Sequence, residues 1–99
     1  MPLDWSAVKR RYRDGRKVPN LAGGRSLEIV GADDRSITIR HTLCEATLRR
    51  DNLERAVIMV EEGKLPRNAP MFVENYRAMV DGERGTSVAQ ILKDLGYLD

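Results

Sequence analysis

The spacing of the apolar residues changes twice along this chain, and this change constrains the fold more than any other feature of the sequence. Near the N-terminus, Trp5, Val8 and Tyr12 recur at helical intervals. Between residues 27 and 41, apolar and polar residues alternate, as in strands that bury one face. From about residue 50 the helical spacing returns. This order predicts an α+β fold with an N-terminal helix, a β-hairpin and three C-terminal helices around one core.

The first helix has recognisable boundaries. Asp4 is a good N-cap, because its carboxylate accepts hydrogen bonds from the amides of the first turn. Leu3 and Val8 have the spacing of a hydrophobic staple around that cap. Gly15 can take the left-handed conformation that ends a helix. We therefore expect a helix between Asp4 and Gly15.

The middle of the chain predicts extended structure. Residues 15–25 contain Pro19 and two adjacent glycines, so we expect a loop there, with at most a short extended piece near residues 18–21. Residues 27–30 and 37–41 are predicted to pair as a β-hairpin around a polar turn. Because two strands alone are marginal in water, we expect a third strand, for which residues 43–48 are the best candidate.

Three helices are predicted after the strands. The first covers residues 50–62, with Asp51 and Glu54 spaced like a capping box. The second begins at Asn68 or Ala69 and ends at Gly82. Their predicted buried faces are formed by Leu53, Ala56, Val57 and Val60, and by Phe72, Val73, Tyr76, Met79 and Val80.

The last helix is expected to open with a capping box formed by Ser87 and Gln90, and to stop at Gly96. Tyr97 and Leu98 are apolar and are expected to fold back onto the core. Together with the preceding helix, this segment also has the outline of a helix-turn-helix motif. An ordinary pair of antiparallel helices explains the same pattern and is the preferred interpretation.

Length and composition favour one small globular domain that covers residues 1–99. The chain has 41% hydrophobic and 32% charged residues, an ordinary balance for a folded protein. Cys44 is its only cysteine, which excludes an internal disulfide and suits a reducing compartment. The N-terminus does not resemble a signal peptide, and no apolar run approaches the ~20 residues that span a bilayer. We expect a cytoplasmic protein without membrane contact.

Positive charge is concentrated at the N-terminus. Residues 1–25 carry seven basic and two acidic groups, whereas residues 26–99 carry ten basic and thirteen acidic groups. On a helical wheel, most of the basic groups lie away from the apolar stripe, so they are candidates for contacts with nucleic-acid phosphates. These candidates are Lys9, Arg10, Arg13, Arg16 and Lys17. The alternative is a solvated surface whose charges are matched by carboxylates elsewhere in the fold.

No motif indicates catalysis, a metal site or a cofactor. The chain has neither of the glycine-rich nucleotide-binding patterns. His41 and Cys44 are the only histidine and cysteine, and on one extended strand their side chains would point to opposite faces. The adjacent acids Asp33 and Asp34 lack the ligand spacing of a calcium loop and suit a turn. We therefore expect no catalytic residue, no metal and no cofactor.

Ile58 and Met59 suggest a different class of function. Both lie outside the apolar stripe of the helix predicted for residues 50–62. Either this helix is covered on a second side within the chain, or its outer side meets another copy in a homodimer. Two hypotheses follow from the sequence. The first is a non-catalytic binding module that contacts nucleic-acid phosphates weakly through its basic N-terminal helix. The alternative is a homo-oligomeric or partner-binding regulatory protein without nucleic-acid contact.

Overall fold

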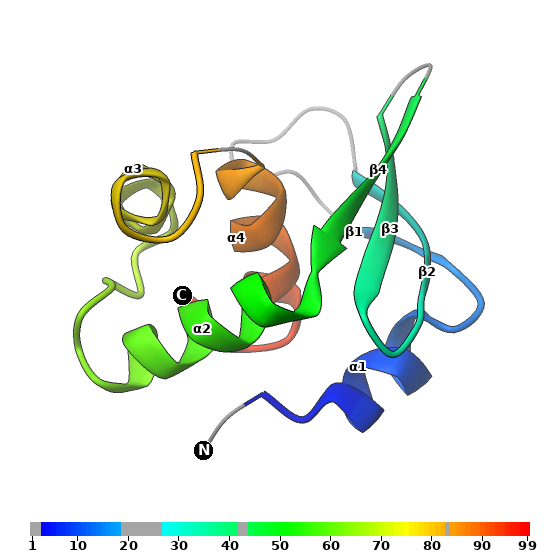
Figure 1. Ribbon diagram of the computed structural model, residues 1–99, viewed down its shortest axis with the longest axis horizontal. Coiled ribbons are helices and arrows are strands. Elements are labelled where there is room, and N and C mark those ends of the chain that lie inside the picture. The colour runs from blue at the N-terminus through cyan, green and yellow to red at the C-terminus, as the bar shows by residue number, and fades with distance from the viewer. Residues whose placement is uncertain (1–2, 19–26, 42–43, 83) are drawn as a thin grey trace.

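The computed structural model describes residues 3–18, 27–41, 44–82 and 84–99, and over these ranges the fold is α+β (Figure 1). An N-terminal helix comes first, then four antiparallel strands, then three helices. The elements are α1 (Trp5–Tyr12), β1 (Arg16–Val18), β2 (Leu27–Ala32), β3 (Ser36–His41), β4 (Cys44–Arg49), α2 (Arg50–Glu61), α3 (Ala69–Met79) and α4 (Gly85–Asp94).

The sheet is a simple meander in the order β1-β2-β3-β4. The predicted hairpin is confirmed as β2 and β3, and the predicted third strand is confirmed as β4. The expectation of a loop after Gly15 was wrong for residues 16 and 17, which pair with β2 in β1. The extended piece expected near residues 18–21 is found at Val18, and residues 19–21 lie outside the described ranges. Gly15 makes this pairing possible, because it has a φ of +82° and a Cβ there would lie 3.1 Å from the carbonyl oxygen of Ile29.

The two faces of the sheet have different chemistry. On the inner face Ile29 pairs with Ile39, and Ile37 pairs with Leu48, all of them buried. On the outer face the cross-strand register places side by side a row of charged residues, which are Lys17, Glu28, Arg40 and Glu45. Alternation of this kind is expected for an antiparallel sheet with one solvated side.

The core lies between the inner face of the sheet and the helices. Helices α2, α3 and α4 gather on one side of the sheet, and α1 lies at the end where β2 turns into β3 (Figure 1). The predicted stripes of α1 and α2 are buried throughout. The stripe of α3 is confirmed only in part, because Phe72 and Tyr76 are buried whereas Met79 is 43% exposed.

Two of the predicted helix caps are confirmed. The Asp4 carboxylate accepts hydrogen bonds from the amides of Ser6 (3.1 Å) and Ala7 (3.3 Å). The Asn68 side chain accepts one from the amide of Met71 (3.3 Å). These side chains satisfy first-turn donors that have no partner within the helix.

The capping box predicted for α2 is wrong. Arg49 occupies its N-cap without a side-chain cap, and Glu54 instead pairs with Arg50 at 3.2 Å. The capping box predicted for α4 is also wrong. This helix begins at Gly85, so Ser87 and Gln90 lie inside it and are buried. A Cβ on Gly85 would lie 3.3 Å from the Tyr76 ring, so a larger residue there would require this ring to shift by a few tenths of an ångström.

Of the predicted ends of the last two helices, one is wrong and one is confirmed. α3 stops at Met79, before the predicted stop at Gly82. The stop at Gly96 is confirmed, because this residue has a φ of +94° and the following amide of Tyr97 donates to the carbonyl oxygen of Leu92 at 2.9 Å. Leu98 is 6% exposed, so the C-terminal residues fold back as expected.

Candidate nucleic-acid interface

The five predicted phosphate-binding residues do not all lie on the N-terminal helix. α1 ends at Tyr12 with Arg13 as its C-cap, so Lys9, Arg10 and Arg13 belong to the helix or its end. Arg16 and Lys17 lie on β1, so their places on the helical wheel of the N-terminal helix do not hold. The helical wheel could not show this, because it assumed a helix beyond Gly15, the residue at which the chain turns into the strand.

Lys9 is held by the turn between β2 and β3. Its ammonium group forms an ion pair and hydrogen bond with the Asp34 carboxylate, which holds the pKa of that carboxyl below its ordinary value. Next to this pair, the Trp5 indole donates to the carbonyl oxygen of Asp33 at 2.6 Å. The Arg50 guanidinium lies over the same indole, 5.3 Å from the ring centroid. Lys9 therefore lies beside the Trp5 contacts that hold α1 against the sheet, and its own ion pair is exposed.

Asp94, at the end of α4, draws together three residues from the opposite end of the chain. Arg11 donates two hydrogen bonds to its carboxylate, at 2.8 and 3.1 Å, and the Tyr12 hydroxyl donates a third at 2.7 Å. The Nε of Arg16 lies 3.9 Å from the same carboxylate, of which only 12% is exposed. Burial alone would raise the pKa of Asp94, but the hydrogen bonds from Arg11 and Tyr12 outweigh it, and the pKa is lowered.

Sequence reasoning did not single out Arg11 or Asp94. They are 83 residues apart, and no local spacing reports such a contact. The only signal was that Arg11 adjoins the buried Tyr12 of the apolar stripe.

Arg10 and Arg13 remain as the unpaired part of the predicted interface. Both are exposed, and neither forms an ion pair within the ranges that the structure describes. They are three residues apart, a spacing that places side chains on the same side of a helix. Positive charge at this end also stabilises α1 itself, because the C-terminal end of a helix carries partial negative charge.

The two basic residues of β1 diverge. Successive side chains of a strand point to opposite faces, and Val18 faces the core, so Arg16 shares its side with the core whereas Lys17 faces outward. On that outer face Lys17 lies directly opposite Glu28 of β2. Lys17 is exposed and forms no ion pair with a described residue. Among the described residues, Arg10, Arg13 and Lys17 therefore have no ion-pair partner. Lys9 and Arg16 are instead engaged by Asp34 and Asp94.

The predicted oligomer interface is reduced to one residue. Ile58 is 42% exposed, so neither α1 nor the C-terminal residues cover it fully. Met59 is partly buried and packs against the core of its own chain. The structure therefore leaves Ile58 as an apolar group on the outer side of α2.

His41 and Cys44 are cross-strand partners at the end of the β3–β4 hairpin. The expectation that they share one extended strand was wrong, because the chain reverses between them. Among the described residues, no group of three histidine, cysteine or carboxylate side chains is placed to hold a metal ion. In the same ranges, none of the helices has the length and apolar character needed to cross a bilayer.

No protein-family model matches this chain, and searches of curated proteins and of solved structures also gave no match.

Proposed function

We propose that this chain is a non-catalytic binding module that contacts nucleic-acid phosphates, weakly and without sequence preference. The contact surface is the basic surface formed by Arg10, Arg13 and Lys17, with Lys9 and Arg16 at its edges. The observation that carries the proposal is the exposed pair Arg10 and Arg13, which has no carboxylate partner among the described residues.

The dimensions of the basic surface support simultaneous phosphate contacts. Four chain steps of 3.8 Å separate Arg13 from Lys17, so their Cα atoms are at most about 15 Å apart. Double-stranded DNA carries one charge per about 1.7 Å of axis, so several phosphates lie within that span. Lys9 can join such a contact, because an exposed ion pair with Asp34 is worth little and exchanges easily.

Salt dependence gives the sharpest test, because each neutralised phosphate releases counterions. Three contacts predict a slope of about −2.7 for the logarithm of the association constant against the logarithm of salt concentration. We expect the affinity for a duplex of mixed sequence, measured by fluorescence anisotropy, to fall roughly 40-fold between about 50 and 200 mM salt. Absence of binding at the lower concentration contradicts the proposal.

A charge-matched pair of variants locates the surface. The double variant Arg10→Glu with Arg13→Glu is expected to abolish the binding. The control is Arg55→Glu with Arg77→Glu, which makes the same change in net charge at exposed positions of α2 and α3. Equal loss in both variants would mean that only the net charge matters, and the assignment to α1 would be wrong.

Self-association is a second candidate, favoured by the exposed Ile58. A two-fold contact through α2 would bury this side chain against its own copy. Light scattering is then expected to give about twice the monomer mass of 11.2 kDa, and Ile58→Asp should restore the monomer. Met71→Asp is the control, since Met71 is 55% exposed on a different helix. A monomeric wild type, or a dimer that survives Ile58→Asp, excludes this interface.

A further inference from the structure

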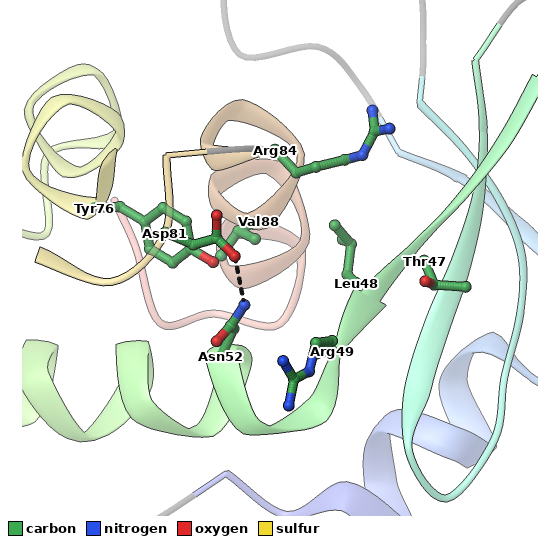
Figure 2. A pocket seen from close by; sticks show the side chains of 8 residues that line it. All are labelled: Thr47, Leu48, Arg49, Asn52, Tyr76, Asp81, Arg84 and Val88. Carbon is green, nitrogen blue, oxygen red and sulfur yellow. Dashed lines mark hydrogen bonds between the residues drawn. The ribbon is translucent and has the colours of Figure 1, made fainter. Parts of the chain in front are cut away.

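A small polar cavity lies at the beginnings of α2 and α4, beside the end of α3, and is separate from the basic surface of α1 and β1 (Figure 2). Its volume is about 160 Å³, and its lining includes the apolar side chains of Leu48 and Val88. Sites for drug-sized ligands begin at roughly 300 Å³. This cavity therefore suits one small chemical group.

Tyr76 brings an unused hydrogen-bond donor to the cavity. Its side chain lines the cavity and is only 1% exposed, with the ring stacked on Phe72 at 5.7 Å between centroids. The hydroxyl forms no hydrogen bond with a described residue. Because no fully buried side-chain nitrogen or oxygen of the described residues lacks a partner, this hydroxyl must open onto the cavity. Burial and the neighbouring Asp81 raise the pKa of Tyr76 to about 12, so the hydroxyl keeps its proton at neutral pH.

Two arginines line the same cavity. Arg84 lies at the beginning of α4 and Arg49 at the end of β4, where α2 begins (Figure 2). Arg84 is exposed and forms no ion pair with a described residue. Arg49 is 3.3 Å from Asp51, but the two side chains are 70% and 78% exposed, so this pair is weak. Neither guanidinium group is fixed by a buried partner. In Figure 2 that of Arg84 points away from Tyr76, so the exposed Arg84 side chain must rotate to reach a ligand beside the phenol.

The helices add partial positive charge. Neither α2 nor α4 has a side-chain cap at its N-terminus, and the first-turn amides of a helix favour anions. Of the lining residues that the structure describes, Asp81 is the one carboxylate, and it accepts a hydrogen bond from the Asn52 amide at 3.0 Å (Figure 2). The described part of the lining thus holds two guanidinium groups and one carboxylate, a net charge of +1 for those residues.

We propose that this cavity binds a small oxyanionic group, a carboxylate or a phosphate, which accepts a hydrogen bond from the Tyr76 hydroxyl and ion pairs from Arg84 and Arg49. Oxyanions match the planar donor arrangement of guanidinium, and an anionic oxygen gives the phenol the partner that it lacks. The site shares no residue with the basic surface of α1 and β1, so it stands or fails independently of nucleic-acid binding.

Amide chemical shifts test the site with sodium acetate and sodium phosphate as separate probes, at an ionic strength matched with sodium chloride. At least one oxyanion is expected to give saturable shifts at Asn52, Asp81 and Val88 that chloride does not give. Saturation by acetate alone identifies the ligand as a carboxylate, and saturation by phosphate alone identifies it as a phosphate. Absence of saturable shifts with both probes overturns the proposal.

Three variants complete the test. Arg84→Gln is expected to weaken binding at least tenfold and Tyr76→Phe about tenfold, since hydrogen bonds to charged groups are worth about 1.5–3 kcal/mol. Arg55→Gln is the control, because it removes one positive charge from α2 outside the cavity and should leave the affinity unchanged. Wild-type affinity in Arg84→Gln or in Tyr76→Phe, or an equal loss in the control, overturns the proposal.

Discussion

Two carboxylates bind α1, one at each side of the helix, and they do so in different surroundings. Asp34 is 78% exposed and holds Lys9 alone, whereas Asp94 is 12% exposed and accepts from both Arg11 and Tyr12. An exposed pair competes with water and salt, while a group withdrawn from water cannot replace a lost partner. Burial therefore decides which contact stabilises the fold and which cation stays available for a ligand.

The largest effect is expected from Asp94→Ala. It leaves the hydroxyl of the fully buried Tyr12 without an acceptor and removes both hydrogen bonds from Arg11. We expect a loss of about 2 kcal/mol in the free energy of unfolding, a modest value for a charged network because Arg11 is itself 35% exposed. Urea denaturation followed by circular dichroism measures it. A loss as small as that of Asp34→Ala would remove the contrast between the two carboxylates.

Tyr12→Phe sharpens the comparison by removing one hydrogen bond and leaving the packing intact. The Asp94 carboxylate keeps Arg11, so we expect a loss of only about 1 kcal/mol in the same measurement. Because both residues belong to one network, the Asp94→Ala and Tyr12→Phe effects should not add in the double variant. Full additivity would show that the hydroxyl acts independently of Asp94.

The pH dependence of stability gives a further test of the role of Asp94. The pKa of Asp94 is lowered in the folded protein, so the folded state takes up a proton less readily than the unfolded chain. The stabilisation is fully present above the ordinary carboxyl pKa of about 3.9 and is lost as the pH falls through the lower value of the folded state. We expect the stability of Asp94→Asn to fall less steeply than that of the wild type below about pH 4. If the stability of both proteins falls equally with pH, Asp94 is not responsible for the loss of stability in acid.

Asp34→Asn should have the smallest effect. The lowered pKa of Asp34 depends on Lys9, but the side chain is largely exposed and its pairing is screened. We expect no measurable shift in the urea midpoint. If Lys9 exchanges Asp34 for phosphate, this variant should bind duplex DNA more tightly than the wild type at low salt. A clear loss of stability would show that the Lys9–Asp34 pair stabilises the fold in spite of its exposure.

Local signals in the sequence were sufficient for most of the helices and for three of the four strands. The caps Asp4 and Asn68 and the buried stripes of α1 and α2 follow from neighbours within one or two turns, which is where such rules apply. β1 was missed because three residues, two of them charged, have too little pattern to predict a strand. Its pairing depends on the strand that it meets rather than on its own residues.

The candidate interface was harder to predict than the fold. The charge of residues 1–25 is visible in the sequence, but which cations are engaged depends on Asp34 and Asp94, which are distant in the chain. Arg84 shows the same limit, because nothing in the neighbouring sequence predicts its left-handed φ of +62°. Such contacts are tertiary, and residue spacing alone does not contain them.

The Arg11–Asp94 contact also has a kinetic consequence. Each strand of the meander pairs with its neighbour in the chain, so the sheet closes only short loops and can form early. Joining residues 83 positions apart closes nearly the whole chain, and this step is expected to follow the folding transition state. Substitution of Asp94 should then accelerate unfolding and leave the refolding rate nearly unchanged. The Arg11–Asp94 contact would then set the lifetime of the native state rather than the rate at which it forms.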